Sequence, residues 1–347
     1  LRGQVSDDQL NEHTVAAIAK AYGTMLRQRD IDSAVIGHDY RQNSEWIAQA
    51  TIEALTSTGV HVIDLGMALT PMMYAAQYHY QTPGGLMVTA SHNPTGWSGF
   101  KLALGYSHTL GPAEMKELYN LAVAEQFTVG NGTVRREDFL DAYAADLLGR
   151  VHISRPVKVV VNAGNGTPGP IVPQILRRAG CEVVELYCDL DWSFPRYFPN
   201  PALVEMMEDT GREVVAAGAD MGLAVDGDGD RLGITDEQGA VIWPDRYLIL
   251  LARQVLEQHP GAKVIFDVKC SQALPEDIAA HGGTPIMWKT GHSYIKQKLW
   301  EEQAPLAGEM SGHIFFGQPD YYGFDDAVFA ALKLAEYLAR HDEPLSA

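Results

Sequence analysis

Three aspartates alternate with glycines in the segment DGDGDR, where Asp226, Asp228 and Asp230 directly follow the apolar run MGLAV. Carboxylates this close in sequence repel one another strongly unless a cation lies among them. Oxygen ligands suit a hard cation such as Mg²⁺ or Ca²⁺, and the glycines allow the tight turn that brings the side chains together. Arg231 is suited to bind an anionic oxygen. The segment therefore predicts a divalent-metal site that handles an anionic group.

Two alternatives remain for this segment. Asp226, Asp228, Asp230 and Glu237 fall at positions 1, 3, 5 and 12 of an EF-hand calcium loop. However, Arg231 stands at position 6, which needs glycine, and the flanking runs MGLAV and LGIT are typical of strands, whereas an EF-hand has helices. The other alternative is a solvated acidic hairpin turn that binds no metal.

Ser91 follows a second apolar run, in the segment VTASHNPTGWSGFK of residues 88–101. Asn-Pro is a common turn dipeptide, so Ser91 could be an ordinary turn residue or a reactive hydroxyl held on a rigid turn. Its neighbour His92 suggests a Ser-His hydrolase. Adjacent side chains on an extended chain point apart, however, and the segment has no GxSxG elbow. We therefore expect the proton carriers for Ser91 to lie elsewhere in the sequence.

Two later loops carry polar side chains that could bind a hydroxylated ligand. In WKTGHSYIK, His292 follows the apolar run TPIMW and has lysines on both sides. In LAGEMSGHIFF, the residues Glu309, Ser311 and His313 occupy alternate positions after a short apolar run. Alternate side chains of a short extended segment share one face. The second loop could therefore direct all three groups toward several hydroxyls of one ligand.

A literal GxGxxG, the segment GNGTPG of residues 164–169, lies between a predicted strand and a predicted helix. Glu185 follows about 20 residues later, as in a dinucleotide-binding fingerprint, which makes an NAD-binding oxidoreductase the alternative from another class. Pro168 removes one backbone N–H from the loop, and Pro170 crowds the approach of the helix that the third glycine should allow. We interpret the segment as a structural strand-to-helix turn.

Three segments repeat one plan of strand, polar loop, helix, glycine and second strand. The first strands are predicted near Val35, Val159 and Ile265, and the glycines after the helices are Gly59, Gly180 and Gly282-Gly283. This alternation indicates βαβ units with buried, mainly parallel strands. A chain of 347 residues also exceeds what one hydrophobic core usually serves. We predict three related α/β domains with mixed, largely parallel sheets around a central cleft, over residues 1–136, 137–240 and 241–347. The candidate loops follow strands, where ligands bind in such folds.

Composition excludes several classes of partner. The formal net charge of −18 opposes binding to nucleic acid or anionic membranes. No apolar run approaches the ~20 residues of a membrane span, and no N-terminal stretch has the pattern of a signal peptide. The cysteines, Cys181, Cys188 and Cys270, are odd in number and form no CxxC pair. They fit reduced packing residues, so we expect a cytoplasmic protein.

Four motifs in this order, TASHNP followed by GFK, DGDGDR, KTGH and GEMSGH, resemble the α-D-phosphohexomutases. The GEMSGH form is most similar to the bacterial phosphomannomutase/phosphoglucomutase branch, and the resemblance covers essentially the whole chain. The initial LRG resembles the end of the family's N-terminal RG segment, which would make Arg2 a phosphate-site residue. GHDYR resembles the family's GRDGR element, but His38 replaces an arginine, so we carry over only Arg41.

The resemblance implies a phosphoserine mechanism. Ser91 would carry the phosphoryl group and, with Asp226, Asp228 and Asp230, would bind one Mg²⁺ per chain. Such a group adds roughly −1.5 to −2 charges at neutral pH, so cationic neighbours are needed. Phosphate would move between O1 and O6 of mannose or glucose phosphate. The 1,6-bisphosphate of glucose or mannose would be both the intermediate and the activator. The domains would then be a phosphoserine, a metal-binding and a sugar-binding domain.

The resemblance also implies roles for the other candidates. Lys101 and His292 would serve as general acid and base, and Arg231 and Arg2 would complete the catalytic residues. The substrate-binding residues would be Glu309 and Ser311 on the 3- and 4-hydroxyls of the sugar, His313 in support of that loop, and Lys269.

One departure from the family concerns a fourth, C-terminal domain, whose loop binds the non-transferring phosphate of the substrate. Nothing in this sequence resembles that loop, and Ala327 stands where glycine is usual after the paired aspartates. Binding energy from a remote phosphate helps drive catalysis at the reacting centre. We therefore expect that domain to be absent here and to be a possible partner, and we expect this chain alone to accept phosphate on Ser91 but to turn over poorly.

Two alternatives lie closer to this family than the oxidoreductase does. A phosphoglucosamine mutase usually has glutamine where Met310 stands. A non-catalytic sugar-phosphate-binding module would keep the loops but carry no phosphate on Ser91.

Overall fold

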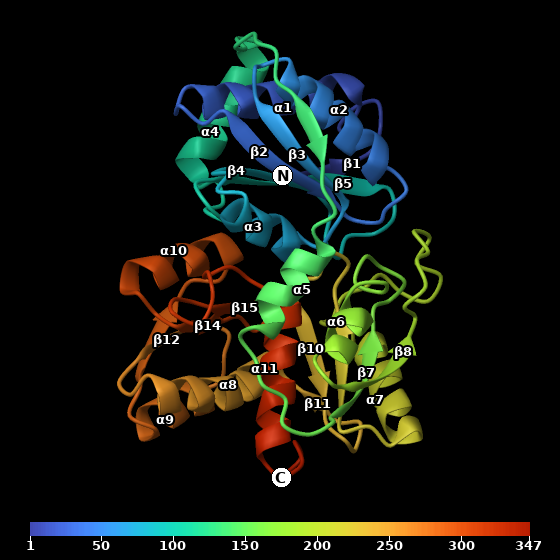
Figure 1. Ribbon diagram of the computed structural model, residues 1–347, viewed down its shortest axis with the longest axis vertical. Helices are drawn as coiled ribbons and strands as arrows, with labels where there is room; N and C mark the ends of the chain where they lie inside the picture. Colours follow the sequence, from blue (N-terminus) through green and yellow to red (C-terminus); the bar gives the residue numbers. More distant parts are fainter. The chain divides into compact units, whose positions relative to one another are not determined.

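The computed structural model describes all of residues 1–347 and divides into two units, Leu1–Tyr143 and Ala144–Ala347 (Figure 1). No helix in it has both the length and the apolar character needed to cross a membrane.

A mixed sheet with the strand order β1-β5-β4-β2-β3-β6 forms the centre of the first unit. Its strands are β1 (Arg2–Gln4), β2 (Ser33–His38), β3 (His61–Met67), β4 (Gly84–Val88), β5 (Trp97–Leu104) and β6 (Val134–Arg136). The helices are α1 (Glu12–Arg27), α2 (Ser44–Thr56), α3 (Thr70–His79) and α4 (Pro112–Ala124), and α5 (Leu140–Leu148) crosses the boundary between the units. Helices α1, α2 and α4 cover one face of the sheet and α3 covers the other (Figure 1).

The second unit contains two sheets. The first has the order β11-β10-β9-β7-β8, and the second has the order β13-β12-β14-β15. The first sheet and its helices comprise β7 (Lys158–Asn162), α6 (Val172–Arg178), β8 (Glu182–Leu186), α7 (Val204–Ala217), β9 (Met221–Val225), β10 (Leu232–Thr235) and β11 (Val241–Ile242). The second comprises α8 (Pro244–Gln258), β12 (Lys263–Asp267), α9 (Ala273–Ala280), β13 (Thr284–Trp288), α10 (His292–Glu302), β14 (Leu306–Gly308), β15 (Ile314–Phe316) and α11 (Ala327–Arg340).

The predicted α/β class with mixed sheets is confirmed. In each sheet parallel pairs are joined to antiparallel ones, as when β7 pairs parallel with β8 and β9 while β9 pairs antiparallel with β10. Strands β2, β7 and β12 lie where the repeat predicted them. Gly59, Gly180 and Gly282 follow their helices with φ of 86°, 97° and 79°. These left-handed values favour glycine, which explains why it recurs after each helix.

The GNGTPG segment forms a tight turn between β7 and α6. A Cβ on Gly169 would overlap the backbone carbonyl of Cys188, so the third glycine serves a close approach within the protein. The buried side chain of Asn162 accepts a hydrogen bond from Gly164 N (3.0 Å) and donates to Tyr197 Oη (2.7 Å). These contacts give Gly164 and Gly169 structural roles within the protein, in agreement with the interpretation as a structural turn. Cys188 and Cys181 are buried free thiols, and Cys270 is a half-buried one.

Helix α11 is buried along most of its length and contacts both β10 and β15, so it packs against both sheets of the second unit (Figure 1). It carries two buried charged side chains, Lys333 and Glu336, whose Nζ and Oε2 atoms are 2.5 Å apart. Glu336 Oε1 also accepts hydrogen bonds from Arg340 (2.8 Å) and from the backbone N–H of His152 (2.9 Å). This carboxylate therefore ties the segment before β7 to α11.

We expect Glu336→Ala to lower the free energy of unfolding by about 3 to 5 kcal/mol, because it leaves the Lys333 ammonium buried without its carboxylate. Urea unfolding followed by circular dichroism measures the loss. The control is Glu182→Ala, which removes the exposed ion pair to Lys158, in which the Glu182 side chain is 64% exposed. That change should cost less than about 1 kcal/mol. Equal, small losses in both variants would contradict the role assigned to Glu336.

Candidate active site

The three aspartates of DGDGDR occupy the turn between β9 and β10, two antiparallel strands. Strands on both sides confirm the argument against an EF-hand. All three side chains are buried, and their carboxylate oxygens lie within 4.8 Å of one another. Asp226 Oδ1 accepts hydrogen bonds from the backbone N–H groups of Asp230 and Arg231, each at 3.1 Å. Burying three carboxylates together is costly without a cation, so this donor set fits a hard divalent ion.

Arg231 and His313 connect the DGDGDR loop to the GEMSGH loop. Arg231 Nε donates a hydrogen bond to His313 Nε2 over 2.9 Å, and the backbone N–H of Leu232 donates to Gly312 O over 3.0 Å. The first bond requires an unprotonated Nε2, which assigns the ring proton to Nδ1. The GEMSGH loop, the turn between β14 and β15, is therefore bonded directly to the strand that follows the aspartates.

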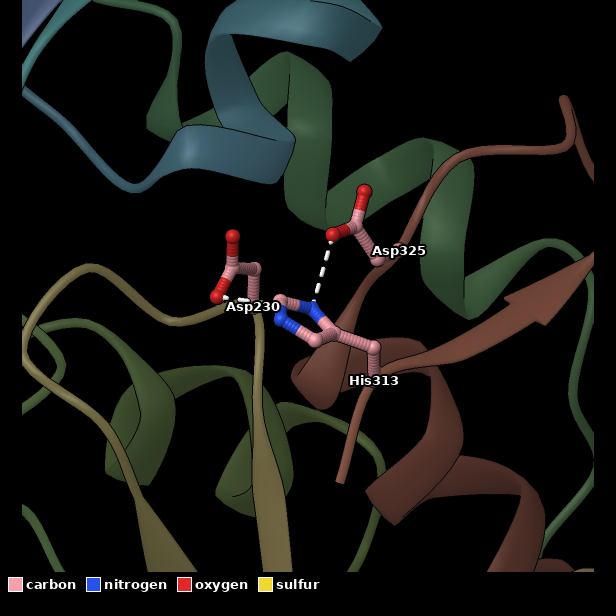
Figure 2. A group of neighbouring side chains, drawn as sticks. All are labelled: Asp230, His313 and Asp325. Atoms are coloured by element: carbon pink, nitrogen blue, oxygen red, sulfur yellow. Dashed lines mark ion pairs between the residues drawn. The ribbon is translucent and has the colours of Figure 1, made fainter. Parts of the chain in front are cut away.

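His313 lies between two carboxylates, as Figure 2 shows. Its Nδ1 is 2.8 Å from Asp325 Oδ2 and 3.7 Å from Asp230 Oδ1. Burial and Arg231 lower the pKa of His313, but the carboxylates of Asp230 and Asp325 outweigh them, so the pKa is raised. Full protonation would still cost the bond from Arg231. The histidine thus couples the DGDGDR loop to Asp325.

Asp325, just before α11, is buried at the centre of a cluster of basic side chains that the sequence analysis missed. Lys296 Nζ lies 3.6 Å from its Oδ1, and His292 Nδ1 lies 3.9 Å from its Oδ2. The rings of His292 and His313 stack with centroids 5.5 Å apart. Burial raises the pKa of Asp325, but the opposing effect of Lys296, His313 and His292 is larger. The pKa of Asp325 is therefore well below its usual range. Asp325 is therefore ionised at neutral pH and holds three basic side chains.

Asp267, at the end of β12, is a second acidic residue that the sequence analysis did not identify. It accepts hydrogen bonds from Thr290 Oγ1 (2.8 Å) and from the backbone N–H of Met310 (3.2 Å). It therefore joins the loop before His292 to the GEMSGH loop. A lone aspartate at the carboxyl end of an apolar strand was the only signal that could have indicated it.

The predicted sugar-binding residues differ in burial. Glu309 is buried, and its Oε1 accepts a hydrogen bond from the backbone N–H of Gly291 (2.5 Å). Burial raises the pKa of Glu309. Ser311 is half-buried and lines a cavity of about 210 Å³ together with Met310 and Leu232. Lys269 is exposed, and its Nζ lies 3.7 Å from Asp267 Oδ2. His292 begins helix α10 directly after Gly291, whereas the sequence analysis placed it in a loop.

Ala327, which departs from the family's glycine, fits the backbone without strain, since its φ is not positive. Its N–H donates to Gly229 O of the DGDGDR loop at 3.3 Å. The alanine therefore makes a backbone contact that either residue could make.

Ser91 lies in the first unit, three residues after β4, with Lys101 on β5 and Arg2 on β1. It is buried and has a φ of 54°, the left-handed region. Ser91 Oγ lies 3.0 Å from His92 Nδ1. The expectation that these adjacent side chains point apart was wrong, because it assumed an extended backbone that Ser91 does not have. Lys101 Nζ donates to Thr70 Oγ1 at 3.3 Å, and Arg2 Nη1 donates to Asn93 Oδ1 at 2.9 Å.

Sequence profiles of three domains cover nearly the entire chain. Phosphoglucomutase/phosphomannomutase alpha/beta/alpha domain I matches residues 1–129, domain II matches 137–239, and domain III matches 243–347. The chain belongs to this family. The phosphomannomutase/phosphoglucomutase of Pseudomonas syringae pv. tomato is 40% identical over 347 residues, which are 100% of this chain and 74% of that protein. The phosphomannomutase of Escherichia coli is 37% identical over 357 residues, covering 99% of this chain and 77% of that protein.

A solved structure from the same family agrees with this fold. The phosphoglucomutase/phosphomannomutase family protein of Burkholderia thailandensis has a TM-score of 0.95 at 38% identity. The alignment covers 100% of this chain and 77% of that one. The chain thus spans about three quarters of the length of the relatives it matches.

Proposed function

We propose that this chain is a phosphohexose mutase that moves phosphate between O1 and O6 of mannose or glucose phosphates, with Ser91 as the phosphoryl carrier. The match to family domains I, II and III along the whole chain carries the proposal. The three domains we propose are 1–136 for the phosphoserine, 137–240 for the metal and 241–347 for the sugar.

The buried carboxylates of Asp226, Asp228 and Asp230 would hold one Mg²⁺, and a phosphoryl oxygen on Ser91 is proposed as a further ligand. The bound cation would withdraw negative charge from the phosphoryl group. Arg231 lies next to these aspartates and is held by His313, so its remaining guanidinium N–H groups could bind an anionic oxygen.

Proton transfer needs one group at Ser91 Oγ and one at the sugar hydroxyl. Lys101 and His292 are the proposed carriers, and the stacking of His292 on His313 restricts the orientation of its ring. Arg2, bonded to Asn93 in the Ser91 loop, is proposed as a phosphate ligand. Glu309 and Ser311 would bind the sugar hydroxyls, with Lys269 near them.

His92 and Lys101 are rival candidates for exchanging a proton with Ser91 Oγ. His92 Nδ1 lies 3.0 Å from that atom, whereas Lys101 is the proposed carrier. We expect Lys101→Met to slow phosphate uptake by Ser91 on the order of 100-fold, the lower end for general acid–base catalysis. We expect His92→Asn to change it by less than about tenfold, which corresponds to 1.4 kcal/mol. Time-resolved intact mass after addition of glucose 1,6-bisphosphate and Mg²⁺ measures both rates. A larger loss in His92→Asn than in Lys101→Met would replace Lys101 by His92 in this role.

The substrate class is tested by discharging the phosphorylated chain with mannose 6-phosphate, glucose 6-phosphate or glucosamine 6-phosphate and following the loss of phosphate by mass. A single turnover avoids any dependence on slow product release. Faster discharge by mannose or glucose phosphate supports the proposal, and faster discharge by glucosamine phosphate supports the phosphoglucosamine mutase alternative. The oxidoreductase alternative predicts saturable quenching or enhancement of NADH fluorescence, which we do not expect.

A further inference from the structure

The backbone of Ser91 is held in an unusual conformation. Its φ of 54° is disfavoured for a residue with a side chain, and the residue is buried in the turn that follows β4. Non-glycine residues persist in this region only where their surroundings over-determine them. Contacts from neighbouring residues must therefore hold the backbone of Ser91 in this conformation.

The carbonyl side of Ser91 is held by Arg41. The guanidinium donates to Ser91 O through Nη2 (2.5 Å), and to Asn93 O (2.9 Å) and Pro94 O (3.2 Å) through Nη1. Arg41 is itself buried. One planar side chain therefore sets the positions of three carbonyls in the SHNP turn.

The amide side of Ser91 is held by Thr89. Ser91 N donates to Thr89 Oγ1 over 2.8 Å, and Thr89 Oγ1 donates to Asp39 Oδ2 over 2.7 Å. Because the hydroxyl has one proton, donation to Asp39 leaves its lone pairs facing Ser91 N. The hydroxyl of Thr89 thus acts as an acceptor of defined direction.

Both sides meet at the carboxylate of Asp39. Its Oδ2 accepts from Arg41 Nε over 3.0 Å as well as from Thr89, and its Oδ1 accepts from Ser44 Oγ over 2.5 Å. The Asp39 side chain is 1% exposed and that of Arg41 is 5% exposed. The contacts close a ring that runs from Ser91 O through Arg41, Asp39 and Thr89 back to Ser91 N.

We infer that Asp39, Arg41 and Thr89 are positioning residues that hold the Ser91 backbone in the left-handed conformation and so keep Oγ in one direction during phosphoryl transfer. This inference rests on the proposed function, in which Ser91 Oγ is the atom that takes and returns the phosphoryl group. The ring provides the preorganisation that such a transfer needs, because a small misplacement of a reacting atom slows the reaction strongly.

Thr89 gives the sharpest test, since two conservative variants separate the hydroxyl from the packing of the side chain. Thr89→Val keeps the shape but removes the acceptor of Ser91 N, and Thr89→Ser keeps the acceptor. The measurement is the first-order rate constant of phosphate gain at Ser91 as a function of the concentration of glucose 1,6-bisphosphate, with Mg²⁺ present. Intact mass follows the gain, and thermal unfolding by circular dichroism reports the fold.

We expect Thr89→Val to lower the limiting rate constant at least tenfold while the half-saturating concentration stays within twofold of the wild type. Thr89→Ser should restore the rate to within about threefold of the wild type, a change of less than 1 kcal/mol. Arg41→Lys, which keeps the charge but not the planar fork, should also lower the limiting rate.

Three results would overturn the inference. The first is a wild-type limiting rate constant in Thr89→Val. The second is an equal loss of that rate constant in Thr89→Val and Thr89→Ser. The third is a change in the half-saturating concentration of glucose 1,6-bisphosphate with no change in the limiting rate constant. A wild-type chain that gains no phosphate would instead contradict the proposed function, and the positioning role with it.

Discussion

Replacing Asp228 by asparagine should weaken Mg²⁺ binding and slow phosphate uptake by Ser91 at least 100-fold at 1 mM Mg²⁺. Asp228 is one of three fully buried carboxylates within 4.8 Å of one another. A metal supplies several kcal/mol of charge stabilisation to a transferring phosphoryl group, and each 1.4 kcal/mol is a factor of about ten. The effect on stability should depend on the metal. Without metal the variant should be at least as stable as the wild type, because one of three repelling carboxylates is gone.

Thermal unfolding in EDTA and in rising Mg²⁺ measures both effects, since a ligand that binds only the folded state stabilises it by RT ln(1 + L/Kd), where L is the free ligand concentration. The matched control is Glu237→Gln, the residue that would be the twelfth ligand of an EF-hand. Glu237 instead bonds Ser346 and should leave the Mg²⁺ response unchanged. If Glu237→Gln weakened Mg²⁺ binding as much as Asp228→Asn did, the assignment of the metal site to the three aspartates would be wrong.

The second large effect is expected for Asp325→Asn. This change removes the carboxylate that faces Lys296, His292 and His313 in the second unit. Loss of a buried counter-charge costs about 3 to 5 kcal/mol. We therefore expect that loss in the free energy of unfolding at pH 7, together with a lower rate of phosphoryl transfer.

The contribution of Asp325 to the free energy of unfolding should depend on pH. The pKa of Asp325 in the folded protein is depressed, so its stabilising contribution is complete above the unfolded pKa of about 3.9 and is lost as the pH falls toward the folded value. The stability difference between wild type and variant should be at least as large at pH 5 as at pH 7, because Asp230 and Asp325 raise the pKa of His313 and the pair with Asp325 strengthens as that ring gains a proton. The difference should become smaller near pH 3.5. Urea unfolding at these three pH values measures it. A difference that already disappears at pH 5 would contradict the depressed pKa.

The sequence predicted the elements around the site because their signals are local. Apolar strands before Asp226 and His292, and the glycines after helices, follow from residue type and spacing. The α/β class with mixed sheets followed from the repetition of those signals.

The missed residues depend on contacts that spacing does not contain. Asp39 and Thr89 are 50 positions apart, and Asp267 and Met310 are 43 apart. Asp39, Thr89 and Asp267 are single polar residues whose partners come from another strand or loop. The His92 error has a different cause, since the sign of φ at Ser91 is set by the surrounding hydrogen bonds and not by the residue itself.

Intact mass of the chain before and after incubation with glucose 1,6-bisphosphate and Mg²⁺ tests the central claim most directly. We expect a gain of one phosphate in the wild type and in Ser193→Ala, where Ser193 is an exposed serine of the second unit, and no gain in Ser91→Ala. Peptide mapping should place the phosphate on Ser91. A wild-type chain that binds the bisphosphate without gaining phosphate would contradict the mutase account and leave the sugar-phosphate-binding module. A gain that persists in Ser91→Ala would contradict the assignment of Ser91 as the carrier.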